Sequence, residues 1–147
     1  MFKAGLFFVL LNFSAMGQEK AGPAASLELI IQHNKEISKG YFLVNLFSSK
    51  DGFPEKYTKA FRSIKIKPTG IKTIYQFDNL PAGNYAVAIL ADINDNGKMD
   101  MNLLGMPKEA FGFSNNVIGL FGPPSFEKAQ IVVQENKRSS VSIELRN

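Results

Sequence analysis

The sequence predicts an all-β fold, a single antiparallel β-sandwich of about seven strands. Three observations lead to this prediction. Apolar and polar residues alternate in several short segments, turn-forming residues separate these segments at sandwich-like spacing, and no segment beyond the N-terminus has the period of a long amphipathic helix. A chain of 147 residues is long enough for one domain and too short for two ordinary ones. Greek-key connections, as in immunoglobulin-like and prealbumin-like folds, suit this pattern, and a closed barrel is the alternative.

The N-terminus is predicted to be a secretory signal. Residues 1–3 are short and basic, residues 5–11 form an apolar run, and residues 14–17 offer the small side chains that a signal peptidase reads. We therefore expect a signal peptide over residues 1–17, cut near Gly17, and a secreted or periplasmic protein. The apolar run is too short to cross a bilayer comfortably, so no membrane span is expected after cleavage. Residues 18–25 are predicted to be a disordered lead-in to one domain at 26–147.

Two strands are expected to open the domain. Leu27, Leu29 and Ile31 fall on one face of a strand over residues 26–33. A turn is expected over residues 34–40. Residues 41–47 are apolar on both faces, which indicates an interior strand.

The middle of the domain continues with three further strands. Residues 55–61 suggest a short helical or irregular crossing, after which Ile64 and Ile66 alternate with lysines in a strand that has one solvated face. A turn leads to a strand over residues 71–77. Pro81 and Gly83 then favour a tight turn into a strand over residues 84–91.

The last third begins with a long segment, residues 101–125, that has no clear period and many glycines and prolines. We expect an ordered loop here, with one short strand at 111–113. Long loops inside compact domains are commonly functional. Strands over 126–134 and 139–146 are predicted to complete the sandwich, the second with Val141, Ile143 and Leu145 inward.

An acidic motif follows directly on the strand at 84–91. It reads D-x-N-x-N-G-x-x-D, with oxygen-bearing side chains at alternate positions and a glycine for a sharp turn, which is the first part of a calcium loop. The twelfth position, where an EF-hand has a bidentate glutamate, is Leu103, so we expect an EF-like loop on a β-scaffold. Asp95 or Glu109 is expected to complete the ligand set. The candidate metal ligands are Asp92, Asn94, Asn96, the backbone carbonyl of Lys98, Asp100 and Glu109.

Calcium is therefore the expected cofactor of this loop, with modest affinity because few carboxylates are present. The alternative is a cluster of Asx turns, in which the same side chains cap their own backbone without a metal. Zinc is not expected, because the chain has no cysteine and one histidine.

Three motifs in order carry a family resemblance: L-P-A-G-N-Y-A-V-A-I-L-A-D-I-N-D-N-G-K-M-D, then L-L-G-M-P-K-E-A-F-G-F-S-N-N, then F-G-P-P-S-F. Over residues 80–126 the chain resembles the bacterial exported family named domain of unknown function two-one-four-one. The resemblance implies a secreted, compact, β-rich domain without an established activity. Many members have a histidine before the first aspartate, where this chain has Ala91, so imidazole chemistry is not implied here. The signature falls on Asp92, Asn94, Asn96, Gly97, Asp100, Gly105, Pro107, Glu109, Gly112, Phe113, Asn115, Gly122 and Phe126.

Composition argues against several classes of function. The net charge of +4 is spread along the chain without a concentrated basic stripe, so nucleic-acid binding is not expected. The absence of cysteine means that no disulfide framework supports the fold. The one histidine, His33, is expected to be an edge or packing residue, and no G-x-S-x-G elbow is present to hold a nucleophilic serine.

The sequence therefore predicts a monomeric, non-catalytic module that binds an unknown protein or glycan partner. One alternative is a hydrolase that uses the carboxylates of the acidic loop, and another is a structural module of an envelope assembly. Phe111, Phe113, Phe121 and Phe126 either line a groove for a ligand or pin the long loop onto the sandwich. Of these two interpretations, we favour the pinning of the loop.

Overall fold

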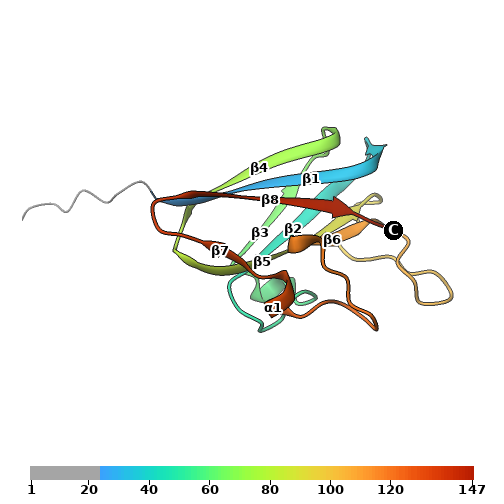
Figure 1. Cartoon of the computed structure of the whole chain (residues 1–147). Helices are drawn as coiled ribbons and strands as arrows, with labels where there is room; N and C mark the ends of the chain where they lie inside the picture. Colours follow the sequence, from blue (N-terminus) through green and yellow to red (C-terminus); the bar gives the residue numbers. More distant parts are fainter. Residues whose placement is uncertain (1–23) are drawn as a thin grey trace, which may run out of the picture.

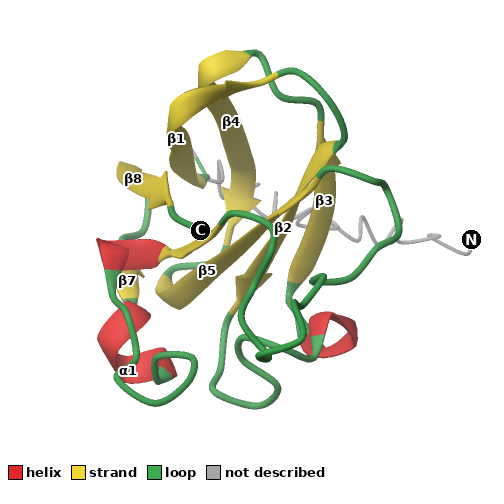
Figure 2. Ribbon diagram, turned by 90° about the vertical axis from the view of Figure 1, so that its right-hand side faces the viewer, coloured by secondary structure: helices red, strands yellow, loops and turns green. Residues whose placement is uncertain are grey.

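Two β-sheets face each other in the computed structural model, which describes residues 24–147 (Figures 1 and 2). The smaller sheet has the order β4-β1-β8, and the larger has the order β3-β2-β5-β6, with β7 also paired to β5. The predicted all-β sandwich is confirmed, with eight strands. The predicted signal peptide and nearly all of the predicted lead-in lie outside the described residues. The strands are β1 (Ala25–Ile37), β2 (Tyr41–Phe47), β3 (Arg62–Ile66), β4 (Gly70–Leu80), β5 (Gly83–Asp92), β6 (Phe111–Phe113), β7 (Ile131–Val133) and β8 (Arg138–Leu145).

All strand pairs are antiparallel except the pair formed by the first and last strands. β1 and β8 run parallel, from Ser26 opposite Arg138 to His33 opposite Leu145. A parallel pair needs a long crossover connection. Here that connection comprises every other strand, and β1 becomes the central strand of the smaller sheet. An isolated bridge between Phe111 and Arg146 links the two sheets at one corner.

The main core lies between the two sheets. On β1 the predicted inward residues Leu27, Leu29 and Ile31 are all buried, as are the alternate residues of β8. β2 lies between β3 and β5, which confirms that it is an interior strand. The alternation of side chains across each strand therefore places one apolar face of each sheet against the other.

A second, smaller core covers the opposite face of β5. Phe47, Ala86 and Ala88 pack there against Phe126 and Ala129. The strand predicted over residues 126–134 is wrong in its first half. Phe126 and Ala129, three residues apart, are buried together on one turn of helix, α1 (Phe126–Ala129), before β7 begins. The period of these apolar residues is therefore helical, not alternating.

The helical segments of the described chain are short. Besides α1, they are the 3₁₀ turns η1 (Tyr57–Lys59), in the predicted crossing, and η2 (Ser114–Asn116), which follows β6. Within residues 24–147, no helix is long and apolar enough to span a bilayer.

Several strands extend beyond their predicted ends. β1 continues to the buried Ile37, so the turn predicted over residues 34–40 shrinks to residues 38–40. Gly40 has a φ of 70°, and a Cβ placed there would lie 2.1 Å from the carbonyl oxygen of Asp92. Only glycine fits this position. The β1–β2 turn is thus packed directly on the start of the acidic loop.

Gly112 provides a test of how β6 packs against β8. A Cβ on Gly112 would lie 2.7 Å from Cγ2 of Ile143 and 3.1 Å from the carbonyl oxygen of Glu144. We expect Gly112→Ala to lower the free energy of unfolding by about 1–3 kcal/mol through overpacking, measured by urea denaturation. The matched control is Gly83→Ala, whose nearest neighbour is 3.8 Å away. Equal stability of the two variants would contradict the described packing.

Candidate functional site

The acidic loop begins at Asp92, the last residue of β5, and the carboxylate of Asp92 organises its first turn. Its Oδ1 accepts a hydrogen bond from the backbone N–H of Asn96 at 3.0 Å, and its Oδ2 accepts one from Gly97 at 2.8 Å. The residue is 0% exposed. Gly97 has a φ of 78°, the left-handed conformation that glycine adopts without strain. The buried carboxylate thus holds the loop onto the end of the strand.

Glu109 joins the two limbs of the loop. Its Oε1 accepts from the N–H of Ile93 at 2.9 Å, and its Oε2 accepts from the N–H of Asp100 at 3.2 Å. Two backbone hydrogen bonds lie beside it, from Ala91 to Ala110 and from Lys108 to Asp100, each 2.8 Å long. Glu109 is itself buried. The Glu109 carboxylate therefore holds the start of the acidic loop, just after β5, to the end of the loop at Asp100.

The remaining side chains of the motif converge on Asp100. Its Oδ2 accepts from the Asn94 side-chain amide at 2.6 Å, and its Oδ1 accepts from the Asn96 amide at 3.0 Å. The Oδ1 of Asn96 in turn accepts from the N–H of Lys98 at 3.0 Å. The side chains of five of the six candidate ligands thus take part in one hydrogen-bond network. Lys98 joins this network through its backbone N–H, whereas its predicted ligand atom is the carbonyl oxygen.

Asp95, weighed as a further ligand, points elsewhere. It has a φ of 59° and forms an ion pair with Lys65 on β3. The hydrogen bond from this ammonium group to Asp95 raises the pKa of Lys65 above its ordinary value. The same ammonium lies 4.1 Å from the centre of the Tyr41 ring. Asp95 therefore ties the outside of the loop to the larger sheet.

The candidate ligands are side chains with carboxylate or amide oxygens, the atom types that calcium prefers and zinc does not. In the structure the amide nitrogens of Asn94 and Asn96 face Asp100. In the part of the chain that the structure describes, no three His, Cys, Asp or Glu side chains gather as a metal-binding group. A cation here would accordingly need the asparagine and backbone oxygens as well as carboxylates.

One comparison with known proteins decides the family. Residues 32–141, about three quarters of the chain, match the family described as "Uncharacterized protein conserved in bacteria (DUF2141)". The chain belongs to the DUF2141 family. The resemblance inferred from the motifs is thereby confirmed, and it extends well beyond them. No curated protein and no solved structure matches this chain significantly.

The positions that carry the DUF2141 resemblance have identifiable structural roles. Gly105 and Gly122 have φ values of 75° and 138°, in the range that favours glycine. Asn115 has a φ of 60°, and its amide donates to the carbonyl oxygens of Lys128 and Gln130 at the end of α1. Together with the loop contacts, these roles show that the motif residues shape the long connection between β5 and α1.

Ser114 is a buried polar residue of this DUF2141 chain that sequence analysis did not single out. Its hydroxyl accepts from the N–H of Val87 at 2.9 Å and donates to the carbonyl of Ala129, so it connects β5 to α1. The neighbouring Asn116 bonds the backbone of β8 at Ser142 and Glu144. The signal that points to these roles is the run S-N-N directly after F-G-F, since Ser and Asn side chains substitute for backbone partners where a strand ends.

The four phenylalanines of the long segment divide into two groups. Phe113 and Phe126 pack edge-on against Phe53, with ring centroids 6.1 and 5.9 Å away, and Phe111 packs against Phe113. These contacts agree with the pinning interpretation. Phe121 is fully exposed and pins nothing.

Proposed function

We propose that this DUF2141 chain is an exported, non-catalytic β-sandwich module whose end loop binds calcium. The observation that carries the proposal is the convergence of the Asn94 and Asn96 amides on the two oxygens of Asp100. Export is supported by the basic, apolar and small-residue pattern of residues 1–17. The calcium proposal is supported by the spacing of the motif together with this convergence.

The amides provide a physical route from the metal-free loop to a calcium-bound one. The oxygen and nitrogen of an asparagine amide are nearly equal in size, and a half-turn exchanges them. Without a cation, the NH₂ groups donate hydrogen bonds to the carboxylate of Asp100. With a cation, the half-turn presents the amide oxygens of Asn94 and Asn96 beside those of Asp100. The few carboxylates imply weak affinity, with a Kd of about 10⁻⁴–10⁻³ M, as in extracellular modules.

The same hydrogen bonds favour a binding module over the hydrolase alternative. An acid–base pair needs carboxyl groups that face a cleft open to substrate. Asp92 and Glu109 are buried and bonded to the backbone of their own loop. The neighbouring hollow, of about 370 Å³, is lined by Met101, Asn102, Leu103, Leu104 and Lys108, without a carboxylate.

A second candidate function, a module of an envelope assembly, is supported by one specific observation. Large apolar side chains are exposed on two loops at one end of the sandwich. Such exposure is expected where a protein contacts another surface. This candidate is compatible with a calcium-bound loop.

The substitution Asn94→Asp tests the calcium proposal, because it should destabilise the metal-free loop and strengthen the stabilisation by calcium. Without calcium it places a second carboxylate against Asp100, and we expect a lower melting temperature from a loss of about 1–2 kcal/mol. At millimolar calcium the wild type should gain about 1 kcal/mol, or a few degrees. Asn94→Asp should gain more, because it adds a charged ligand. EDTA should reverse both gains in calorimetry.

The matched control is Asn84→Asp, the same change at an exposed position near the other end of β5. Its response to calcium should equal that of the wild type. Asp100→Ala should lose the response. The calcium proposal fails if millimolar calcium leaves the wild-type melting temperature unchanged, or if Asn94→Asp responds no more strongly than Asn84→Asp.

A further inference from the structure

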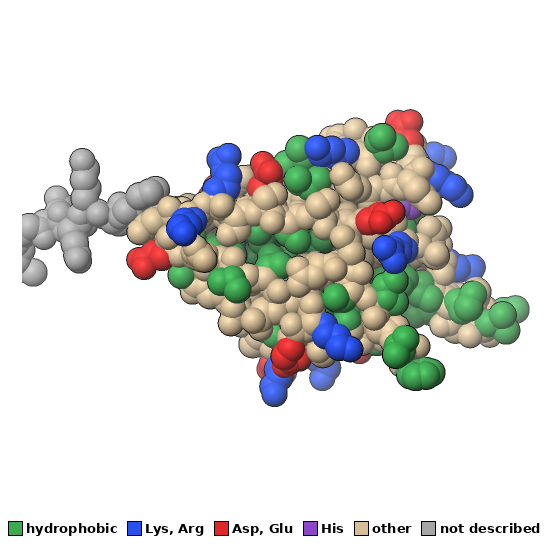
Figure 3. Space-filling view, viewed as in Figure 1, with side chains coloured by type: hydrophobic (Ala, Val, Ile, Leu, Met, Phe, Trp, Pro, Cys, Tyr) green, Lys and Arg blue, Asp and Glu red, His purple; other side chains and the backbone are tan. Residues whose placement is uncertain are grey.

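Two loops expose large apolar side chains at their tips. The first tip, residues 101–106, follows the acidic loop, and the second, residues 118–121, follows η2. Figure 1 shows both loops projecting at the end of the molecule where the C-terminus lies, and Figure 3 shows hydrophobic side chains gathered at that end. The exposed residues are Met101, Leu103, Leu104 and Met106 in the first tip and Ile118, Leu120 and Phe121 in the second.

The segment that carries the apolar tips has few charged residues of its own. Between Met101 and Phe126 the sequence contains two charged residues, Lys108 and Glu109, and Glu109 is buried. Lys98 and Lys108 are exposed on either side of the first tip, and within residues 24–147 neither has an ion-pair partner within 4.0 Å. With the half-exposed carboxylate of Asp100 included, these two lysines leave a small positive excess beside the first tip.

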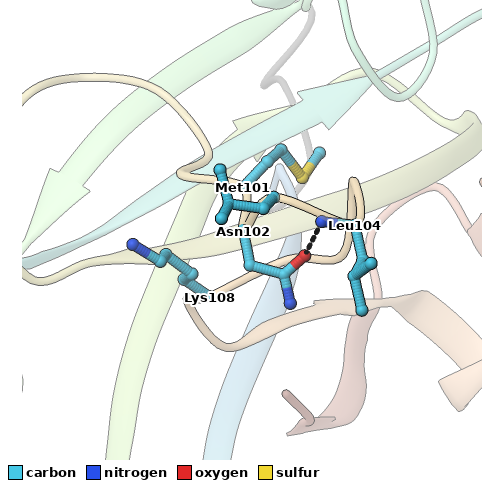
Figure 4. A pocket seen from close by; sticks show the side chains of 5 residues that line it. Met101, Asn102, Leu104 and Lys108 are labelled. Carbon is cyan, nitrogen blue, oxygen red and sulfur yellow. Dashed lines mark hydrogen bonds between the residues drawn. The ribbon is translucent and has the colours of Figure 1, made fainter.

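The first apolar tip is bonded internally. The N–H of Asn102 donates to Met106 O at 2.8 Å, and the N–H of Gly105 donates to Asn102 O at 3.0 Å. The side-chain oxygen of Asn102 accepts from the N–H groups of Leu104 and Met106 at 2.9 and 3.0 Å; the bond to Leu104 is drawn in Figure 4. Backbone donors that already have partners can leave water at low cost. Within the first tip, the N–H groups of Asn102, Leu104, Gly105 and Met106 therefore keep their partners when the tip enters a less polar medium.

The second apolar tip is a tight turn. A Cβ on Gly119 would lie 1.9 Å from the carbonyl oxygen of Gly122, so the chain folds back on itself around Leu120 and Phe121. Both apex side chains are fully exposed. The two prolines that follow lack N–H groups. Both tips thus place large apolar side chains at the apex of a narrow turn, and the internal hydrogen bonds are those of the first tip.

We propose that the apolar tips insert into the interfacial layer of an anionic phospholipid membrane, with Lys98 and Lys108 beside the lipid head groups. Lipid adapts to narrow protruding tips, whereas a protein partner needs an extended complementary surface. Positive charge beside the apolar apices matches anionic head groups. The inference deepens the proposed function by naming its partner, and its test does not depend on calcium.

The absence of native cysteine allows a position-specific test on the full chain. We would label single cysteines, Leu104→Cys, Phe121→Cys and, as a control on β4, the exposed Ile74→Cys, with an environment-sensitive fluorophore. Vesicles of phosphatidylcholine with one third phosphatidylglycerol should shift the emission of both tip labels to the blue. The label at position 74 should not shift. All variants retain the same N-terminal residues, so any lipid contact made there is common to them.

Substitutions then test the energetics in vesicle sedimentation. Replacing Leu103, Leu104, Leu120 and Phe121 by serine should lower the partition coefficient by at least about tenfold. Serine at the exposed Ile71 and Ile74 should have no effect. Lys98→Gln and Lys108→Gln, which each remove one positive charge, should each weaken binding about fivefold on the anionic vesicles and leave the weaker binding to pure phosphatidylcholine unchanged.

Several outcomes would overturn the inference. Tip labels that do not respond to vesicles would overturn it. So would tip labels whose emission shifts without lipid in proportion to protein concentration, which would indicate that a second copy covers the tips. Unchanged partition of the serine variant would also overturn it. The vesicle experiments are done with EDTA present throughout, so they are independent of calcium. Binding to vesicles without a calcium response in melting would retain this inference and reject the calcium proposal. A calcium response without binding to vesicles would retain the calcium proposal and reject this inference.

Discussion

Phe47→Ala is expected to lower the free energy of unfolding by about 3–5 kcal/mol, the range for truncating a buried phenylalanine. Phe47 is 0% exposed and packs edge-on against Phe53, with ring centroids 5.3 Å apart. It belongs to the smaller core that attaches α1 to the outer face of β5. A domain of this size has about 5–15 kcal/mol of stability in total, so the variant should be close to unfolding.

The matched control is Phe121→Ala, the same chemical change at a fully exposed side chain. Its midpoint in urea should equal that of the wild type. Circular dichroism and tyrosine fluorescence should report one transition for each variant if the smaller core is part of the cooperative unit. A loss below about 1 kcal/mol for Phe47→Ala would contradict the described burial.

Asp92→Ala is the second substitution with a large expected effect. The change removes two charge-assisted hydrogen bonds, from the N–H groups of Asn96 and Gly97. We expect a loss of about 2–4 kcal/mol, measured in EDTA so that metal binding does not contribute. Amide hydrogen exchange provides a local measurement, because exchange at Asn96 and Gly97 should accelerate most.

Asp95→Asn is the appropriate control, since it removes a carboxylate from the same loop at an exposed position and keeps a residue that tolerates positive φ. A loss well below 1 kcal/mol is expected, as for other surface ion pairs. If Asp92→Ala and Asp95→Asn had equal effects on stability and exchange, the buried carboxylate would not be the anchor of the loop.

The regular part of the fold is readable in the sequence because burial on one face of a strand imposes a period of two. This holds for Leu27, Leu29 and Ile31 on β1 and for Val141, Ile143 and Leu145 on β8, all of which are buried. β2 was expected to be interior because it is apolar on both faces, and it lies between β3 and β5. Each of these predictions rests on a local pattern.

The parts that sequence analysis missed depend on contacts between distant segments. α1 buries Phe126 and Ala129 in a core formed with Phe47 of β2. Phe47 and Phe126 are 79 positions apart in the sequence. The parallel pairing of β1 with β8 has no local signature either. Ser114 is buried because its hydroxyl connects Val87 to Ala129, two partners that are far from it in sequence.

The acidic loop is predicted from the sequence in part, because some of its contacts are local and others join distant segments. Its turn chemistry is local, so the D-x-N-x-N-G spacing indicates that Asp92 and Asp100 belong to one compact loop. The role of Glu109 as a brace depends on the return of the chain to Ala91, which the motif does not specify. The direction of Asp95 depends on Lys65, a residue of another strand. Which of the acidic side chains converge therefore follows from the sandwich.

The parallel pair of β1 and β8 has a consequence for the order of folding. Glu28 and Ser140, which contact each other across this pair, are 112 residues apart. β1 is the central strand of the smaller sheet, so that sheet stays incomplete until β8 is present. Contacts of such sequence separation slow folding. If the chain is exported, as proposed, this delay keeps it unfolded and able to pass through a translocation channel until β8 has been synthesised.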